Sequence, residues 1–72
     1  MAKLRFIGFI AEIAGAREID IQLDQPTPLR ELLAVRLPEE RMIVLINQQG
    51  GTFDTLICDS VAVTALPVVS GG

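Results

Sequence analysis

Residues 27–47 read TPLRELLAVRLPEERMIVLIN and predict a helix followed closely by a buried strand. Thr27 is a suitable N-cap, Pro28 suits the first helical position, and Pro38 stops the helix. Leucines at i, i+3, i+4 and i+8 give this helix one apolar stripe: Leu29, Leu32, Leu33 and Leu37. The run MIVLIN is too short and too rich in β-branched residues for a helix, so we expect a strand that is buried on both faces.

A strand and a short helix are predicted before this unit. KLRFIGF, residues 3–9, alternates with the period of two that is typical of a strand. One face of this strand carries Leu4, Phe6 and Gly8, and the other carries Lys3, Arg5, Ile7 and Phe9. The following AEIAGA, residues 11–16, indicates a short helical turn closed by Gly15, because glycine readily adopts the positive φ found at helix ends.

The remaining segments complete a mixed sheet. Residues 18–23 alternate apolar and polar side chains, which predicts a half-solvated antiparallel strand. Residues 48–52, with two glycines, are expected to form a turn or loop, and residues 55–58 a short strand or a helical turn. VAVTAL, residues 61–66, is the last strand, and Pro67 ends its ladder. Because a single helix has to cover one face of this sheet, the fold class is α+β with two layers, and MIVLIN should lie inside the sheet.

Composition excludes several classes of function. A chain of 72 residues forms one domain, and its 50% hydrophobic content supplies a core without metals or disulfides. The absence of histidine removes a His-based metal site and the usual base of a nucleophilic triad. A net charge of −3 does not favour binding to nucleic acid, and no apolar run is long enough for a membrane span. The lone thiol, Cys58, favours a reducing cytoplasm, and its apolar surroundings in the sequence predict a buried, inert side chain.

The chain ends in the extended segment LPVVSGG, residues 66–72. After Pro67, six residues can span roughly 20 Å, and glycine, which has no Cβ, can pass through a channel too narrow for other side chains. We therefore expect a domain of residues 1–66 followed by an extended arm of residues 67–72. This arm would present the carboxylate of Gly72 for activation by a partner.

The sequence resembles the ubiquitin-like β-grasp sulfur carriers, and most closely the small subunit of molybdopterin synthase. The resemblance lies in four stretches: KLRFIGFIAEIAG, PTPLRELL, INQ and LPVVSGG. The resemblance covers nearly the whole chain, and the LPVVSGG end is its most specific part. Two departures are visible. The stretch from Asp59 to Ala62 replaces the Asp-Gly-Asp-Glu that is common in the family, and Val68 stands where a second proline often follows the first.

The resemblance implies a role in molybdopterin (molybdenum cofactor) synthesis. A ubiquitin-activating-type adenylyltransferase would use ATP to adenylate the Gly72 carboxylate, and a sulfur donor would convert it to a thiocarboxylate. The arm would then enter the large catalytic subunit of molybdopterin synthase, where sulfur passes to a pterin precursor. This chain would bind no cofactor itself and would not be catalytic alone.

The resemblance also implies which residues meet the partners. Gly71 and Gly72 form the reactive end, and the expected contacts to the partners are Leu66, Pro67, Val68, Val69 and Ser70. Alternation along the first strand adds Ile7 and Phe9, which point away from the core side of Leu4 and Phe6. Ile7 and Leu66 are expected on the sheet face opposite the core, where an apolar cluster would favour a protein partner.

Three alternatives remain open. The sulfur carrier for thiamine thiazole synthesis has a Gly-Gly end and a similar stretch to residues 46–49, INQQ, but it normally has a tight hairpin where this chain has AEIAG. A ubiquitin-like protein modifier would use the same activated glycine to acylate a lysine of a target, and Lys3 alone leaves few sites for chains of the modifier itself. A purely structural binding module would require the LPVVSGG end to be irrelevant.

Overall fold

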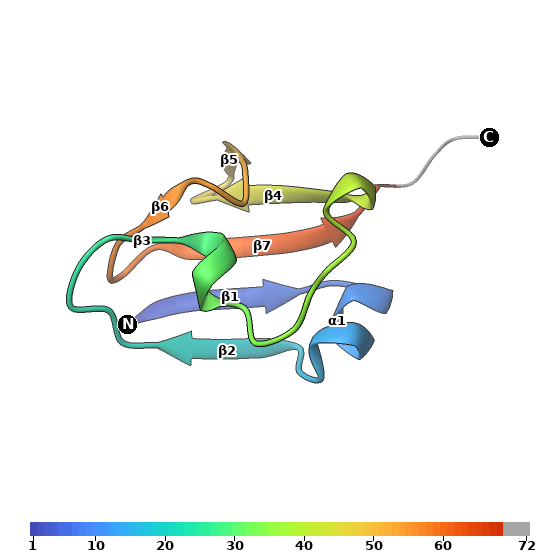
Figure 1. Cartoon of the computed structure of the whole chain (residues 1–72), viewed down its shortest axis with the longest axis horizontal. Coiled ribbons are helices and arrows are strands. Elements are labelled where there is room, and N and C mark those ends of the chain that lie inside the picture. The colour runs from blue at the N-terminus through green and yellow to red at the C-terminus, as the bar shows by residue number, and fades with distance from the viewer. Residues whose placement is uncertain (69–72) are drawn as a thin grey trace.

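The computed structural model describes residues 1–68, and the predictions for residues 69–72 lie outside this range. Strands are the main regular structure of the described chain (Figure 1). In chain order the elements are β1 (Ala2–Phe6), α1 (Phe9–Ala14), β2 (Glu18–Ile21), β3 (Thr27–Pro28), the 3₁₀ turns η1 (Leu29–Leu32) and η2 (Glu39–Arg41), β4 (Met42–Ile46), β5 (Gln49–Gly51), β6 (Leu56–Ile57) and β7 (Ala62–Pro67). Within this range no helix is long and apolar enough to cross a membrane.

The predicted α+β class with a mixed sheet is confirmed. Five strands form one sheet in the order β2-β1-β7-β4-β5, and β3 pairs with β6 in a separate two-stranded ladder. The strands that come first and last along the chain, β1 and β7, are neighbours inside the sheet and run parallel. Every other pair of neighbouring strands is antiparallel (Figure 1). The strand predicted from MIVLIN lies inside the sheet as expected, because β4 is flanked by β7 and β5.

The core lies between one face of the sheet and the segments that cross it. Side chains from the three central strands point to this face and are buried: Leu4, Phe6, Val44, Val63 and Ala65. They are covered by buried residues from α1, η1 and the β5–β6 region: Ile10, Leu29, Phe53 and Ile57. Alternation of buried and exposed residues along β1 and β7 follows the period of two in the sequence.

The long helix expected between Thr27 and Leu37 is wrong. Thr27 and Pro28 form β3, and only Leu29–Leu32 make a 3₁₀ turn before Leu33 adopts an extended backbone. The backbone N–H groups of Leu29 and Arg30 donate to the carbonyl oxygens of Thr55 and Phe53, so the segment is held to a distant loop. Because Pro38 disfavours helix at the preceding residue, too few residues remain for another helical turn. The helix of this fold is instead α1, which Gly15 ends with φ of 80°, as predicted for that glycine.

Several predicted boundaries also change. The first strand ends at Phe6 instead of residue 9, and Phe9 begins α1. Only one face of β4 is buried, since Ile43 is 43% exposed. The turn expected at residues 48–52 is two residues long, at Asn47 and Gln48, and β5 follows it directly. Both turn residues have positive φ, as the twist of a two-residue hairpin requires. Of the two structures considered for residues 55–58, the short strand is present as β6.

Candidate functional site

The last described residues are fixed to the end of the sheet. Pro67 is in register with Met42 at the start of β4, and the N–H of Val68 donates to the carbonyl oxygen of Arg41 at 2.8 Å. The ladder therefore continues one residue beyond Pro67, which was expected to end it. Proline is tolerated here because alternate residues of β7 direct their N–H toward β1, and β1 ends before it reaches this position. The described part of the chain thus ends next to η2, held there by a backbone hydrogen bond.

Three apolar side chains from three strands lie in a row at this end of the sheet. Leu66 is in register with Ile43 of β4. On its other side it neighbours Ile7, which follows the Phe6–Ala65 pair and donates its N–H to Ala65 at 2.9 Å. Since Phe6, Ala65 and Val44 point into the core, these three residues occupy the opposite face. We call Ile7, Leu66 and Ile43 the apolar row; Ile7 and Ile43 are 42% and 43% exposed, and Leu66 is half-buried.

Ion pairs occupy the same face next to the apolar row. Arg5 donates to Glu18 Oε2 at 3.2 Å, and Lys3 Nζ lies 3.2 Å from Glu18 Oε1. The hydrogen bond from Lys3, followed by that from Arg5, lowers the pKa of the Glu18 carboxyl below its ordinary value. The outer face of the sheet is therefore apolar near the end of β7 and charged toward the start of β1.

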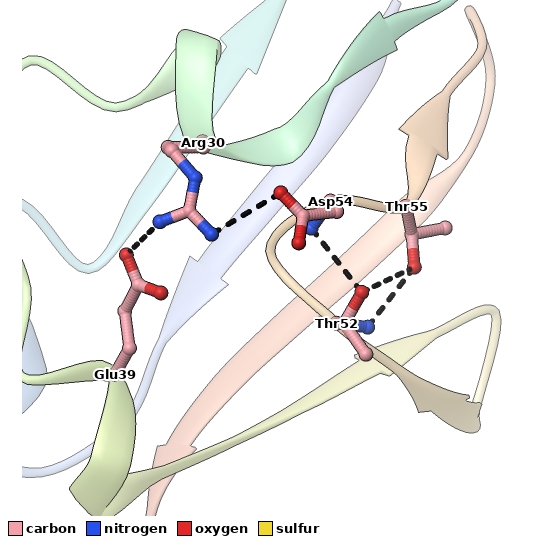
Figure 2. Close-up of polar contacts among 5 residues, drawn as sticks. All are labelled: Arg30, Glu39, Thr52, Asp54 and Thr55. Carbon is pink, nitrogen blue, oxygen red and sulfur yellow. Dashed lines mark hydrogen bonds and ion pairs between the residues drawn. The ribbon is translucent and has the colours of Figure 1, made fainter.

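A second polar cluster connects the segments that cross the core side. Arg30 of η1 pairs with Glu39 of η2 and, at 3.2 Å, with Asp54 of the β5–β6 loop (Figure 2). These two carboxylates, Glu39 first, raise the pKa of the Arg30 guanidinium above its ordinary value. The loop is further ordered by Thr52, whose N–H donates to Thr55 Oγ1 at 3.0 Å and whose hydroxyl accepts from the N–H of Asp54 (Figure 2).

This Arg30 cluster lines an open groove of about 730 Å³ beside β4 and β5. The floor of the groove is formed by buried apolar residues, Met42, Val44 and Phe53. Because the guanidinium of Arg30 engages the carboxylates of Glu39 and Asp54, the cluster cross-links η1, η2 and the loop. We assign the cluster a structural role, because it holds in place the segments found where a long helix was expected.

Comparison with known structures identifies the fold. No family model and no curated protein matches the chain. Haloferax volcanii SAMP1, small archaeal modifier protein 1, superposes with a TM-score of 0.71 at 16% identity, over 99% of this chain and 98% of its own. A Pyrococcus furiosus protein provisionally named molybdopterin converting factor, subunit 1, gives 0.68 at 18% identity, over 94% and 97%. The HVO 2177 protein of H. volcanii is 30% identical, with a TM-score of 0.67, over 99% of this chain and 85% of its own.

This chain has the ubiquitin-like β-grasp fold. The resemblance found in the sequence is thereby confirmed at the level of the fold. In this β-grasp protein the predicted reactive residues Gly71 and Gly72, together with Val69 and Ser70, lie outside the described range. The described part ends at Val68 and includes the apolar row beside it.

The structure separates the residues predicted to contact partners. It brings Ile7 and Leu66 together, and it places Pro67 and Val68 at the same end of the sheet. Phe9 is 44% exposed but belongs to α1 and not to the sheet face. Ile43 was missed, because the apolar run around it suggested burial on both faces.

The predicted burial of Cys58 is wrong for this β-grasp protein. Its thiol is free and exposed, although the preceding Ile57 is fully buried. Alternation explains the difference, since Leu56 and Cys58 lie on one side of β6 and Ile57 on the other. The two carboxylates near it in the sequence do not form a pair: Asp54 bonds Arg30, while Asp59 accepts the N–H of Leu23 at 3.2 Å. Cys58 is therefore a surface thiol without a neighbouring acid–base pair in residues 1–68.

Proposed function

We propose that this protein is a sulfur carrier whose Gly72 carboxylate is adenylated and then converted to a thiocarboxylate. In this proposal the thiocarboxylate donates sulfur to the pterin precursor of molybdopterin. The observation that carries the proposal is the LPVVSGG end of the sequence, whose first residues, 66–68, are held at the end of the sheet beside the apolar row. The likeness to the P. furiosus molybdopterin converting factor subunit supports the same assignment.

The chemistry divides between this chain and its partners. The Gly72 carboxylate attacks ATP, pyrophosphate leaves, and the resulting acyl adenylate has an electrophilic carbonyl carbon. A sulfur nucleophile attacks that carbon, and AMP leaves with the electron pair of the broken C–O bond. Acid–base groups for these steps are assigned to the adenylyltransferase and the large synthase subunit, because this chain has no histidine to serve as the usual base.

Docking to the large subunit is assigned to the apolar row and to the arm. A row of three exposed or half-exposed aliphatic side chains on a small domain favours burial against a partner. Partner contacts are therefore proposed at Ile7, Ile43 and Leu66, with Phe9 at the margin and residues 67–70 along the arm. A partner that holds both surfaces fixes the direction in which Gly72 enters its active site.

Intact-mass measurement tests the proposal. Protein produced with its activating enzyme, a sulfur donor and ATP should gain the mass of one sulfur in place of one oxygen. Deleting Gly72, or adding one alanine after it, should abolish that gain while urea unfolding remains unchanged. An extended variant that gains sulfur at the wild-type yield would show that the terminal carboxylate is not the site.

A second candidate function is protein modification. The likeness to H. volcanii small archaeal modifier protein 1 favours it. The same acyl adenylate would then be attacked by a lysine amine of a target, which forms an amide. The thiamine thiazole carrier is less well supported, because α1 occupies the position between β1 and β2 where that carrier is expected to have a tight hairpin. The identity of the neighbouring gene would distinguish the two carrier pathways: a gene for a large synthase subunit would favour molybdopterin synthesis, and a gene for a thiazole synthase would favour thiamine synthesis.

A further inference from the structure

Residues 33–38 connect η1 to η2 and form neither helix nor strand. We call this segment the strap. The backbone becomes extended at Leu33, and the backbone of residues 34–36 forms no hydrogen bond within residues 1–68. The carbonyl oxygens of its last two residues accept bonds only from η2, which follows directly. In the described chain, therefore, no backbone bond joins the strap to the sheet.

One buried side chain and one ion pair hold the strap in place. Leu37 is the only buried residue of the strap, at 5% exposure, and it belongs to the apolar core. Arg30 of η1 and Glu39 of η2 pair across the two ends of the strap. Because both of these side chains are partly exposed, the pair contributes little to stability. The strap can therefore open locally, by withdrawal of Leu37, while the strands of the sheet stay paired.

The strap also carries a basic residue, Arg36, which is exposed. The chain has five other lysines and arginines, and each lies in β1 or has a backbone hydrogen bond to another segment: Lys3, Arg5, Arg17, Arg30 and Arg41. A protease needs several extended, unpaired residues around the bond that it cuts, so those five sites require more of the fold to open. The bond between Arg36 and Leu37 is therefore the basic-residue site that requires the least unfolding.

We propose that a protease specific for basic residues cuts this protein first between Arg36 and Leu37, through local opening of the strap. The proposal does not depend on the activation of Gly72. Opening withdraws Leu37 from the core and separates Arg30 from Glu39, and the five-stranded sheet remains intact. Water then adds to the carbonyl carbon of Arg36 and the C–N bond to Leu37 breaks, which leaves a carboxylate and an amine without any further co-reactant.

The cut divides the chain without dividing the sheet. Residues 1–36 carry β1 and β2, whereas β4, β5 and β7 belong to the other fragment. The two fragments meet where β1 pairs with β7, along four pairs of residues. They should therefore remain associated after the cut, but their association then depends on protein concentration. A protease acting on the strap would in this way convert one domain into a complex that dilution can separate.

Limited digestion of the full-length folded protein with trypsin, followed by intact-mass measurement, tests the proposal. The first products should be residues 1–36 and residues 37–72, and they should elute together in size-exclusion chromatography without denaturant. The variant Arg36→Gln should abolish this cut. Because opening and closing are fast relative to cutting at low trypsin concentration, the cutting rate reports the population of the open strap.

Two charge variants test the ion pair that spans the strap. Glu39→Gln removes this pair and should raise the cutting rate about two- to fivefold. Asp54→Asn is the matched control, because it removes the other carboxylate from Arg30 and leaves the pair with Glu39 in place. It should change the rate by less than about twofold. A Glu39→Gln protein that is cut no faster than Asp54→Asn would contradict the role of the pair in closing the strap.

Two core variants distinguish local opening from unfolding of the whole domain. Leu37→Ala should raise the cutting rate at least about tenfold, because a smaller side chain leaves the core on opening. Val63→Ala, in β7, should lower the urea midpoint but leave the cutting rate within about twofold of the wild type. Equal acceleration by both variants, relative to their loss of urea stability, would show that cutting follows global unfolding. A first cut after any other basic residue would overturn the assignment of the strap.

Discussion

Asn47 and Ala62 are joined by two hydrogen bonds that fix the β4–β5 hairpin to the start of β7. The N–H of Asn47 donates to the carbonyl oxygen of Ala62 at 2.8 Å, and the N–H of Ala62 donates to Asn47 Oδ1 at 3.0 Å. Asn47 makes both bonds at φ of 51°, a conformation that asparagine tolerates better than most residues. Its side chain thus takes the place of one backbone group in the ladder.

Replacing Asn47 tests this connection. Asn47→Ala should lower the free energy of unfolding by about 1–2 kcal/mol, because it removes one hydrogen bond and places alanine in the left-handed region. Asn47→Asp keeps an oxygen acceptor, so its loss in the free energy of unfolding should be less than half of the loss caused by Asn47→Ala. Urea unfolding of both variants provides the measurement, and equal losses would show that the side-chain bond contributes nothing.

The next turn residue, Gln48, should be improved by glycine. Its φ of 70° strains a residue that has a Cβ. We expect Gln48→Gly to raise the free energy of unfolding by about 0.5–1 kcal/mol. The control is Gln49→Gly, one residue later in the extended strand β5, which should lower it by a similar amount. Unfolding midpoints that move in the same direction for both variants would contradict the assigned turn.

Two adjacent glycines of β5 should respond differently to alanine. A Cβ at Gly51 would overlap Ile46 Cγ1, whereas a Cβ at Gly50 would meet no atom within 4 Å. Gly51→Ala should therefore destabilise the protein by about 1–3 kcal/mol, and Gly50→Ala should change its stability by less than about 0.5 kcal/mol. Thermal melts of the two proteins compare them directly; a loss for Gly50→Ala alone would contradict the register of β4 and β5.

Charge in the apolar row should weaken binding to the proposed partner, a large synthase subunit. Ile7→Asp or Leu66→Asp would bury a carboxylate in an apolar contact, and we expect the Kd to rise at least about tenfold. Leu56→Asp is the matched control, because Leu56 is 58% exposed on β6, away from the row. Titration calorimetry on variants with wild-type melting temperatures gives the comparison. If Leu56→Asp weakens binding as much as the other two, the docking surface lies elsewhere.

Low pH should remove the contribution that the ionised Glu18 carboxylate makes to folding stability. Its pKa is lowered in the folded protein by Lys3 and Arg5, so the folded state binds a proton less readily than the unfolded state. The resulting stability is present above the unfolded pKa, about 4.3, and is lost as the pH falls through the lower folded pKa. The urea midpoint of Glu18→Gln should decrease less across this pH window than that of the control, Glu31→Gln. Glu31 is a suitable control because it makes no ion pair within residues 1–68. Identical acid dependence in both variants would contradict the assignment.

The sequence predicted the strands better than the segments that cover them. Alternation placed Leu4 and Phe6 on the core side and Ile7 opposite, because that pattern depends only on local geometry. The leucine stripe of residues 29–37 failed for a non-local reason: the N–H groups of Leu29 and Arg30 bond carbonyls more than twenty residues away. Such bonds leave no periodic signal in the sequence.

The candidate site was predictable in part for the same reason. The LPVVSGG end and the partnership of Ile7 with Leu66 follow from motif and alternation. Ile43 and Cys58 were misjudged because an apolar run does not show which of its faces is covered. The Arg30 cluster depends on Glu39 and Asp54 being brought together by the fold, so nothing in their spacing along the chain indicated it.

The parallel pairing of β1 with β7 has a consequence for the order of events in the cell. These central strands come from opposite ends of the described chain, so the sheet cannot close until β7 has been synthesised. Contacts this distant in sequence also make folding slow relative to a helical protein of the same size. A ribosome-bound fragment that lacks β7 would expose the core face of β1 and be open to proteolysis. Folding is thereby coupled to the synthesis of β7, and an enzyme that recognises the closed sheet would act only on molecules in which β7 has paired with β1.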